Sequence, residues 1–139
     1  MPSMIFVNLP TRDLERSDAF YGALGFTKNP DFSDENASSW MISDSIFVMV
    51  LKEAFYSSFL RGGDVAAFGE GSKQMLNALS CASVEEVDRL AETAAATGGA
   101  IYRQPAEEVP GMMYGGAVTD PDGHVWELAW MDFSGGAPQ

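Results

Sequence analysis

The chain has 139 residues, about the length of one domain, and 46% of them are hydrophobic, which is enough to build a core. Its formal net charge of −12 would repel phosphate backbones and anionic lipid surfaces, so neither nucleic acid nor a membrane is expected as a partner. No apolar run approaches the ~18 residues of a membrane span, and the start MPSMIFVNLP lacks the basic segment of a signal peptide, so we expect a cytoplasmic protein.

The first half of the chain reads as one strand, one helix and three further strands. An apolar run over residues 4–9 leads into a helix that begins after Asp13, a typical N-cap, and ends at Gly25, where a left-handed C-cap is expected. Strand-like segments follow over residues 26–32, 38–43 and 45–51. This first unit covers residues 4–52.

The segment over residues 53–75 is predicted to connect this unit to a second one. It begins with a short helical stretch over residues 54–60 and continues through Gly62-Gly63 and Gly69-Glu70-Gly71, which indicate a loop. At the other end of the chain, the sequence SGGAPQ indicates a disordered tail, so residues 133–139 are left out of the predicted fold.

The second half repeats the order of elements. An apolar run over residues 76–82 leads to a helix with Ser83 as its N-cap, where Glu86 three residues on completes a capping box, and Gly98 ends it. This unit covers residues 76–132. Its three further strands are predicted over residues 100–104, 113–119 and 124–131.

The two units can be aligned with each other. Matching the helix caps pairs Asp13 with Ser83, an offset of 70 residues, and matching the final turns pairs Asp44 with Asp122, an offset of 78. The offset grows because the helix and loops of the second unit are longer. The sequence therefore predicts an α+β protein built from two strand-helix-three-strand (βαβββ) repeats.

This doubled unit, with DLERSDAFYGALGF early and DPDGHVWEL late, resembles the vicinal oxygen chelate superfamily. That group contains glyoxalase I (lactoylglutathione lyase), extradiol dioxygenases and bleomycin-resistance proteins, and this chain is most similar to small bacterial glyoxalase-like proteins. The resemblance implies a curled mixed sheet around a central cavity, and a homodimer. For members of the superfamily that bind a metal, the resemblance implies four ligands that face the cavity, one on the first and one on the last strand of each unit.

The four positions that correspond to those ligands do not favour a metal. The internal alignment places Phe6, Met49, Leu76 and Glu127 there. Phenylalanine and leucine have no donor atoms, and a thioether suits soft ions such as Cu(I) rather than Zn, Ni, Mg or Fe(II). Cys81 is the only cysteine, so a thiolate zinc site is also excluded. We therefore expect neither a metal nor another cofactor.

Strand alternation turns Glu127 away from Trp126 and Leu128 and toward the implied cavity. A carboxylate in a core-facing strand is unfavourable unless hydrogen bonds or a cation receive it, and Asn8 and Tyr114 are the expected donors. The residues that we predict to contact a ligand form a mainly apolar set with a few polar groups. They are Phe6, Asn8, Phe47, Met49, Leu76, Ala78, Tyr114 and Glu127.

Three functions are compatible with this set. The preferred one is a metal-free small-molecule binding protein anchored by Glu127, with a cationic ligand favoured by the net charge of −12. The second is a lyase of the lactoylglutathione lyase type, which the resemblance supports and the missing metal ligands oppose. The third is a metal-independent enzyme in which Glu127 is the catalytic general base. The sequence leaves open whether the protein is an enzyme.

Overall fold

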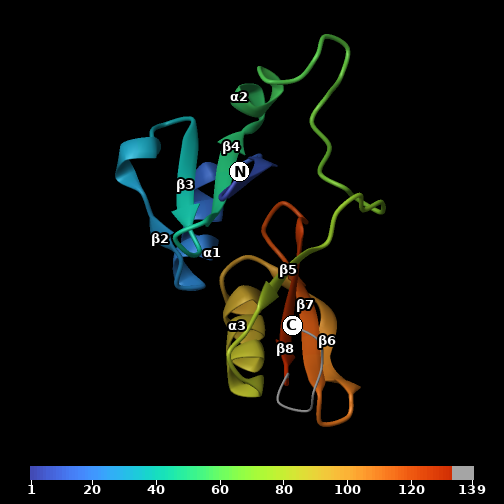
Figure 1. Ribbon diagram of the computed structural model, residues 1–139. Coiled ribbons are helices and arrows are strands. Elements are labelled where there is room, and N and C mark those ends of the chain that lie inside the picture. Colours follow the sequence, from blue (N-terminus) through green and yellow to red (C-terminus); the bar gives the residue numbers. More distant parts are fainter. Residues whose placement is uncertain (133–139) are drawn as a thin grey trace. The chain divides into compact units, whose positions relative to one another are not determined.

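The computed structural model describes residues 1–132 and divides the chain into two compact units, Met1–Gly69 and Glu70–Gln139 (Figure 1). Each unit contains one four-stranded mixed sheet and one longer helix. Among the described residues, none of the helices has the length and apolar character needed to cross a membrane. The predicted disordered tail, residues 133–139, lies outside the described part of the chain.

The first unit follows the predicted order of elements. Its bounds are β1 (Ile5–Thr11), α1 (Leu14–Ala23), β2 (Thr27–Lys28), the 3-10 helix η1 (Pro30–Phe32), β3 (Ala37–Met41), β4 (Ile46–Lys52) and α2 (Glu53–Ser57). The strand order is β1-β4-β3-β2, with β1 parallel to β4 and the other pairs antiparallel.

The strand predicted over residues 26–32 is much shorter than expected. Only Thr27–Lys28 pairs with β3, because the chain then turns into η1. Asn29 caps this turn by accepting a hydrogen bond from the backbone N–H of Asp31 at 3.0 Å, and Pro30 supplies a fixed φ at its start. The helix predicted over residues 54–60 is also shorter, since α2 ends at Ser57.

The core of the first unit lies between α1 and its sheet. Phe20 and Tyr21 are fully buried, and their rings meet edge to face with centroids 5.0 Å apart. Tyr21 also lies 6.4 Å from the Trp40 ring on β3, and Val48 opposes Trp40 on β4. The side chains of Trp40 and Val48 therefore mark the face of this sheet that α1 covers.

The second unit repeats the arrangement. Its bounds are β5 (Asn77–Ser80), α3 (Val84–Ala96), β6 (Ala100–Val109), β7 (Met113–Thr119) and β8 (Val125–Met131), in the sheet order β5-β8-β7-β6. The strand predicted over residues 100–104 is longer than expected, because β6 runs on past Pro105 to Val109. Its register with β7 shifts at three points along the way.

Both helix starts and both helix ends agree with the sequence signals. Asp13 accepts from the Arg16 N–H, and Ser83 accepts from the Glu86 N–H, each at 3.1 Å. The carboxylate of Glu86 in turn accepts a hydrogen bond from the backbone N–H of Ala82, the residue before the cap. Gly25 and Gly98 both have a φ of 96°, the left-handed conformation that favours glycine after a helix.

The strand registers confirm the internal alignment. In the first unit Asn8 pairs with Met49, and in the second Ala78 pairs with Glu127, so the offsets of 70 and 78 residues link equivalent positions. The strand orders of the two sheets are also equivalent. The predicted α+β class with two βαβββ repeats is thus confirmed.

Candidate functional site

Glu127 lies on the face of the second sheet that turns away from α3. Its neighbours Trp126 and Leu128 are buried on the other face. The face with Trp126 and Leu128 is the one that α3 covers. Tyr114 pairs in register with Trp130 on this face, and its hydroxyl donates to Asp88 of α3 at 2.6 Å. Glu127 therefore occupies the sheet face left open by the helix, as strand alternation predicts.

An arginine and a second carboxylate accompany Glu127 on this face. Arg103 of β6 places Nη2 at 3.5 Å from Oε2 of Glu127, and its Nη1 donates to Oε1 of Glu108 at 2.5 Å. The three side chains are 46%, 31% and 29% exposed, in the order Arg103, Glu127, Glu108. We call these three residues the carboxylate–arginine cluster.

Small residues on the middle strand make the cluster possible. Ala117 of β7 lies in register between Arg103 and Glu127, so these two side chains, which start from strands roughly 9–10 Å apart, meet above its methyl group. The carboxylate of Glu108 lies above Gly115, where an added Cβ would be 3.3 Å from its Oε1. A larger side chain at either position would obstruct the cluster.

The structure corrects the expected partners of Glu127. Tyr114 lies on the opposite face and donates to Asp88, so it is not a donor to Glu127. The side-chain amide of Asn8 donates to the carbonyl of Phe6 on its own strand at 3.1 Å. The cation that receives Glu127 is Arg103, which the sequence did not reveal.

Arg103 escaped prediction because β6 is irregular. Ile101 pairs with Val118, and a regular strand continuing from that pair would place Arg103 opposite Gly116, on the face that α3 covers. A shift between Ile101 and Arg103 pairs Arg103 with Ala117 instead. One extra residue in a strand turns the following side chains to the other face. The one available signal was Pro105, since a proline within a strand indicates an edge or a bulge.

Four of the other predicted residues meet on the sheet of the first unit. Phe6 pairs in register with Phe47, and Asn8 with Met49, on the face opposite Val48. The rings of Phe6 and Phe47 are stacked, with centroids 4.8 Å apart and an interplanar angle of 11°. Phe6 is 52% exposed. This half of the predicted set forms an accessible aromatic surface.

The remaining predicted residues belong to the second unit. Ala78 is adjacent to Glu127 in register, and its small side chain leaves room beside the carboxylate. Leu76 precedes β5 and is exposed.

Two hollows lie away from the predicted residues. One of about 270 Å³ is lined by residues of α3 and β6. The other, of about 650 Å³, is lined by residues 11–15, Lys52 and Glu53.

The donor set does not fit a divalent metal. Within residues 1–132 there is no group of three or more His, Cys, Asp or Glu side chains that could hold an ion. Of the four positions aligned with metal ligands, Phe6 and Leu76 have no donor atom, Met49 offers a thioether, and Glu127 already has a cation beside it.

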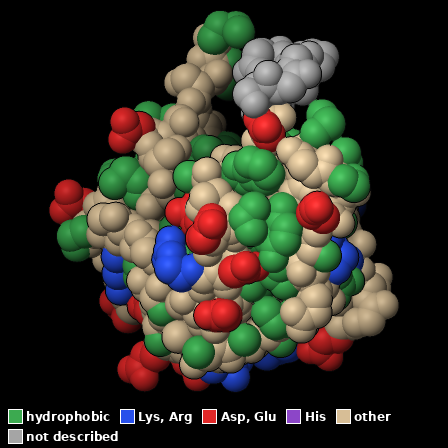
Figure 2. All heavy atoms as spheres, turned by 90° about the horizontal axis from the view of Figure 1, so that it is seen from below, with side chains coloured by type: hydrophobic (Ala, Val, Ile, Leu, Met, Phe, Trp, Pro, Cys, Tyr) green, Lys and Arg blue, Asp and Glu red, His purple; other side chains and the backbone are tan. Residues whose placement is uncertain are grey.

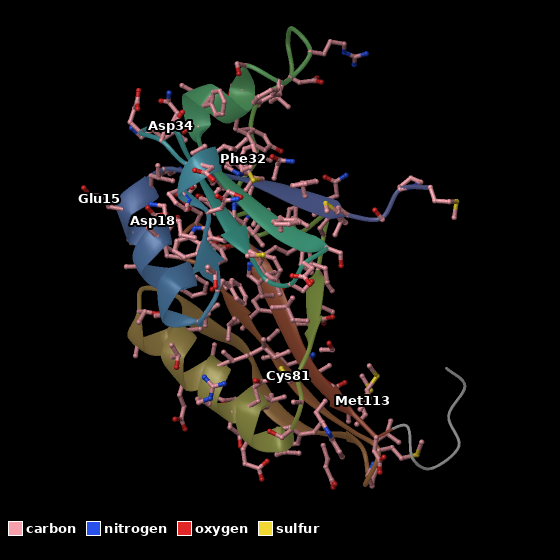
Figure 3. The ribbon with its side chains drawn as sticks, turned by 60° about the vertical axis from the view of Figure 1, so that its left-hand side comes forward. Glu15, Asp18, Phe32, Asp34, Cys81 and Met113 are labelled. Carbon is pink, nitrogen blue, oxygen red and sulfur yellow. The ribbon has the colours of Figure 1, made fainter. Side chains whose placement is uncertain are left out.

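The single thiol is not suited to nucleophilic chemistry. Cys81, labelled in Figure 3, follows directly after β5. Its side chain is buried. Burial raises the pKa of this thiol, and the charge of Glu86 raises it further. A thiol with a raised pKa is protonated at neutral pH, whereas the thiolate is the reactive form.

Tyr114 is expected to titrate at a higher pH than a free tyrosine. Its hydrogen bond to Asp88 raises the pKa above the ordinary value of about 10, and burial adds to the increase. Because the folded state favours the protonated phenol, this contribution to stability is complete below about pH 10 and is lost as the pH rises through the raised pKa. Absorbance titration of phenolate in the wild type, with Tyr114→Phe to identify the step, measures the pKa. Asp88→Asn should lower it, and an unchanged midpoint would contradict the assignment.

Residues 4–38 match the family described as bleomycin resistance protein-like, N-terminal. A glyoxalase-related enzyme from Fulvimarina pelagi is 26% identical with a TM-score of 0.77, over 94% of this chain and 88% of that one. A hypothetical protein from S. aureus is 25% identical with a TM-score of 0.76, over 94% of both chains.

A lactoylglutathione lyase from Agrobacterium tumefaciens shares the fold at a greater distance, with 15% identity and a TM-score of 0.66 over 94% of both chains. A search of curated proteins gave no match.

Proposed function

Because the chain belongs to the vicinal oxygen chelate superfamily of glyoxalases, bleomycin-resistance proteins and dioxygenases, we propose that it is a metal-free small-molecule binding protein with Glu127 as its polar anchor. The observation that carries this proposal is the placement of Glu127. It is a partly exposed carboxylate on an open sheet face, and the other positions aligned with metal ligands lack hard donors.

A cationic ligand with an apolar part is the class that the charges favour. The net charge is −12, and acidic side chains are spread over the face seen in Figure 2. The carboxylate–arginine cluster contains two carboxylates and one guanidinium, which leaves one negative charge uncompensated. The stacked rings of Phe6 and Phe47 are a separate surface, within the first unit, that an organic cation can contact favourably.

Glu127→Gln is expected to keep the fold and to weaken a cationic ligand by about 1–3 kcal/mol, because it removes the charged acceptor. We would screen bleomycin and a set of aromatic amines by thermal shift, with benzylamine and uncharged benzyl alcohol as a matched pair. The best compound is then titrated calorimetrically, with and without chelator. Glu92→Gln, an exposed residue of α3, makes the same charge change away from the cluster.

The outcomes separate the proposal from its alternatives. Binding that needs benzylamine's charge and falls in Glu127→Gln but not in Glu92→Gln supports it. If no compound raises the melting temperature, or if both variants bind equally, the proposal is wrong. Metal-dependent turnover of lactoylglutathione would instead favour a lyase.

We also propose a homodimer located in the cytoplasm. Met4, just before β1, and Ile5 at its start are exposed, and β1 is an edge strand of its sheet. Exposed apolar edges of this kind commonly pair with another chain. Light scattering that found only a 15.0 kDa particle over a wide concentration range would contradict the dimer.

A further inference from the structure

We propose that Arg103 is a built-in competitor of the cationic ligand at Glu127, and that Glu108 retains its guanidinium when the ligand enters. This inference rests on the proposed function, because it names the group that the ligand displaces. Arg103 then determines the specificity of the site for ligand charge. It is not one of the site residues predicted from the sequence.

The two contacts of Arg103 differ in strength. Its Nη1 donates a charge-assisted hydrogen bond to Oε1 of Glu108 at 2.5 Å, closer than the ~2.7–2.9 Å usual for such a pair. Its distance to Glu127 is 3.5 Å, which is an ion pair without a good hydrogen bond. All three side chains are partly exposed, so the longer ion pair stabilises the fold little. The contact with Glu127 is therefore the exchangeable one.

The backbone explains why the guanidinium can stay with Glu108. Both residues belong to β6, and the shifts of register between them bring Glu108 back to the face that Arg103 occupies. To reach Glu127, Arg103 has to extend over Ala117 on the middle strand. Its contact with Glu108 does not require it to cross that strand.

This arrangement discriminates between ligands by charge. A ligand cation that replaces Arg103 beside Glu127 leaves each of the two carboxylates with one cation and so neutralises the cluster. A neutral ligand cannot replace the charge of Arg103, and displacing the guanidinium would leave Glu127 without a cation. An anion meets two carboxylates that already compete for one guanidinium. The cluster thus favours monovalent cations over neutral molecules of the same shape.

The test is a set of calorimetric titrations with benzylamine, and with benzyl alcohol as the uncharged control. Arg103→Gln should tighten benzylamine by about two- to fivefold, the worth of an exposed ion pair, and leave benzyl alcohol unchanged. Glu108→Gln should weaken benzylamine, because the released guanidinium then competes fully for Glu127. Arg89→Gln on α3 makes the same charge change as Arg103→Gln and should have no effect.

A double variant distinguishes competition from a general charge effect. If Glu108 acts through Arg103, Glu108→Gln should no longer weaken binding when Arg103→Gln is already present. Simple addition of the two effects, or equal gains in Arg103→Gln and Arg89→Gln, would overturn the inference. If Glu127→Gln weakens benzylamine while Arg103→Gln does not tighten it, the proposed function stands and this inference fails. If no compound of the screen binds either the wild type or Arg103→Gln, both fail.

Discussion

Phe20→Ala is expected to lower the free energy of unfolding by about 3–5 kcal/mol, the range for removing a fully buried aromatic ring. Phe20 is 0% exposed and packs edge to face against Tyr21 on α1. The substitution leaves a cavity where α1 meets the first sheet, and surrounding side chains in a close-packed core collapse only partly into such a space. Urea denaturation followed by circular dichroism measures the loss.

Phe32→Ala is the matched control. Phe32 lies on η1 in the same unit, is labelled in Figure 3, and is 68% exposed. Its replacement removes the same ring from a surface position and should change the free energy of unfolding by less than about 0.5 kcal/mol. A loss in Phe20→Ala as small as the one in Phe32→Ala would mean that Phe20 does not contribute to the core.

The fold could be predicted because its signals are local in the sequence. Asp13 and Ser83 bond to N–H groups three residues away, and Gly25 and Gly98 supply the positive φ that ends each helix. These contacts depend on no distant part of the chain, so each could be read from a few neighbouring residues. The repeat then aligned the remaining strands.

The partner of Glu127 could not be predicted because it depends on pairing between strands. The predicted strand stopped at residue 104, before Pro105, since proline cannot donate to a ladder hydrogen bond. In the structure β6 is an edge strand of its sheet, where a missing donor is tolerated, and it continues to Val109. That continuation contains Glu108, and the register shifts turn Arg103 to the open face. Neither effect follows from alternation within one strand.

Gly116→Ala is expected to lower the free energy of unfolding by about 3 kcal/mol, the upper part of the range for overpacking. A Cβ at Gly116 would lie 2.8 Å from the carbonyl oxygen of Arg103 and 2.9 Å from the backbone N and Cα of Pro105. These are backbone atoms, so no side-chain rotation relieves the overlap, and β6 has to move away from β7. The same movement carries Arg103 away from Glu127. Urea denaturation and amide hydrogen exchange along β6 measure both effects.

Gly62→Ala controls for the general effect of replacing a glycine. A Cβ at Gly62 meets no atom within 4 Å, and its φ lies outside the left-handed region, so this variant should be neutral or slightly more stable. Faster exchange confined to β6 in Gly116→Ala, with an unchanged pattern in Gly62→Ala, is the expected result. If Gly116→Ala were as stable as the wild type, β6 would not lie as close to Gly116 of β7 as the structure places it. The bulges that turn Arg103 toward Glu127 would then lose their structural basis.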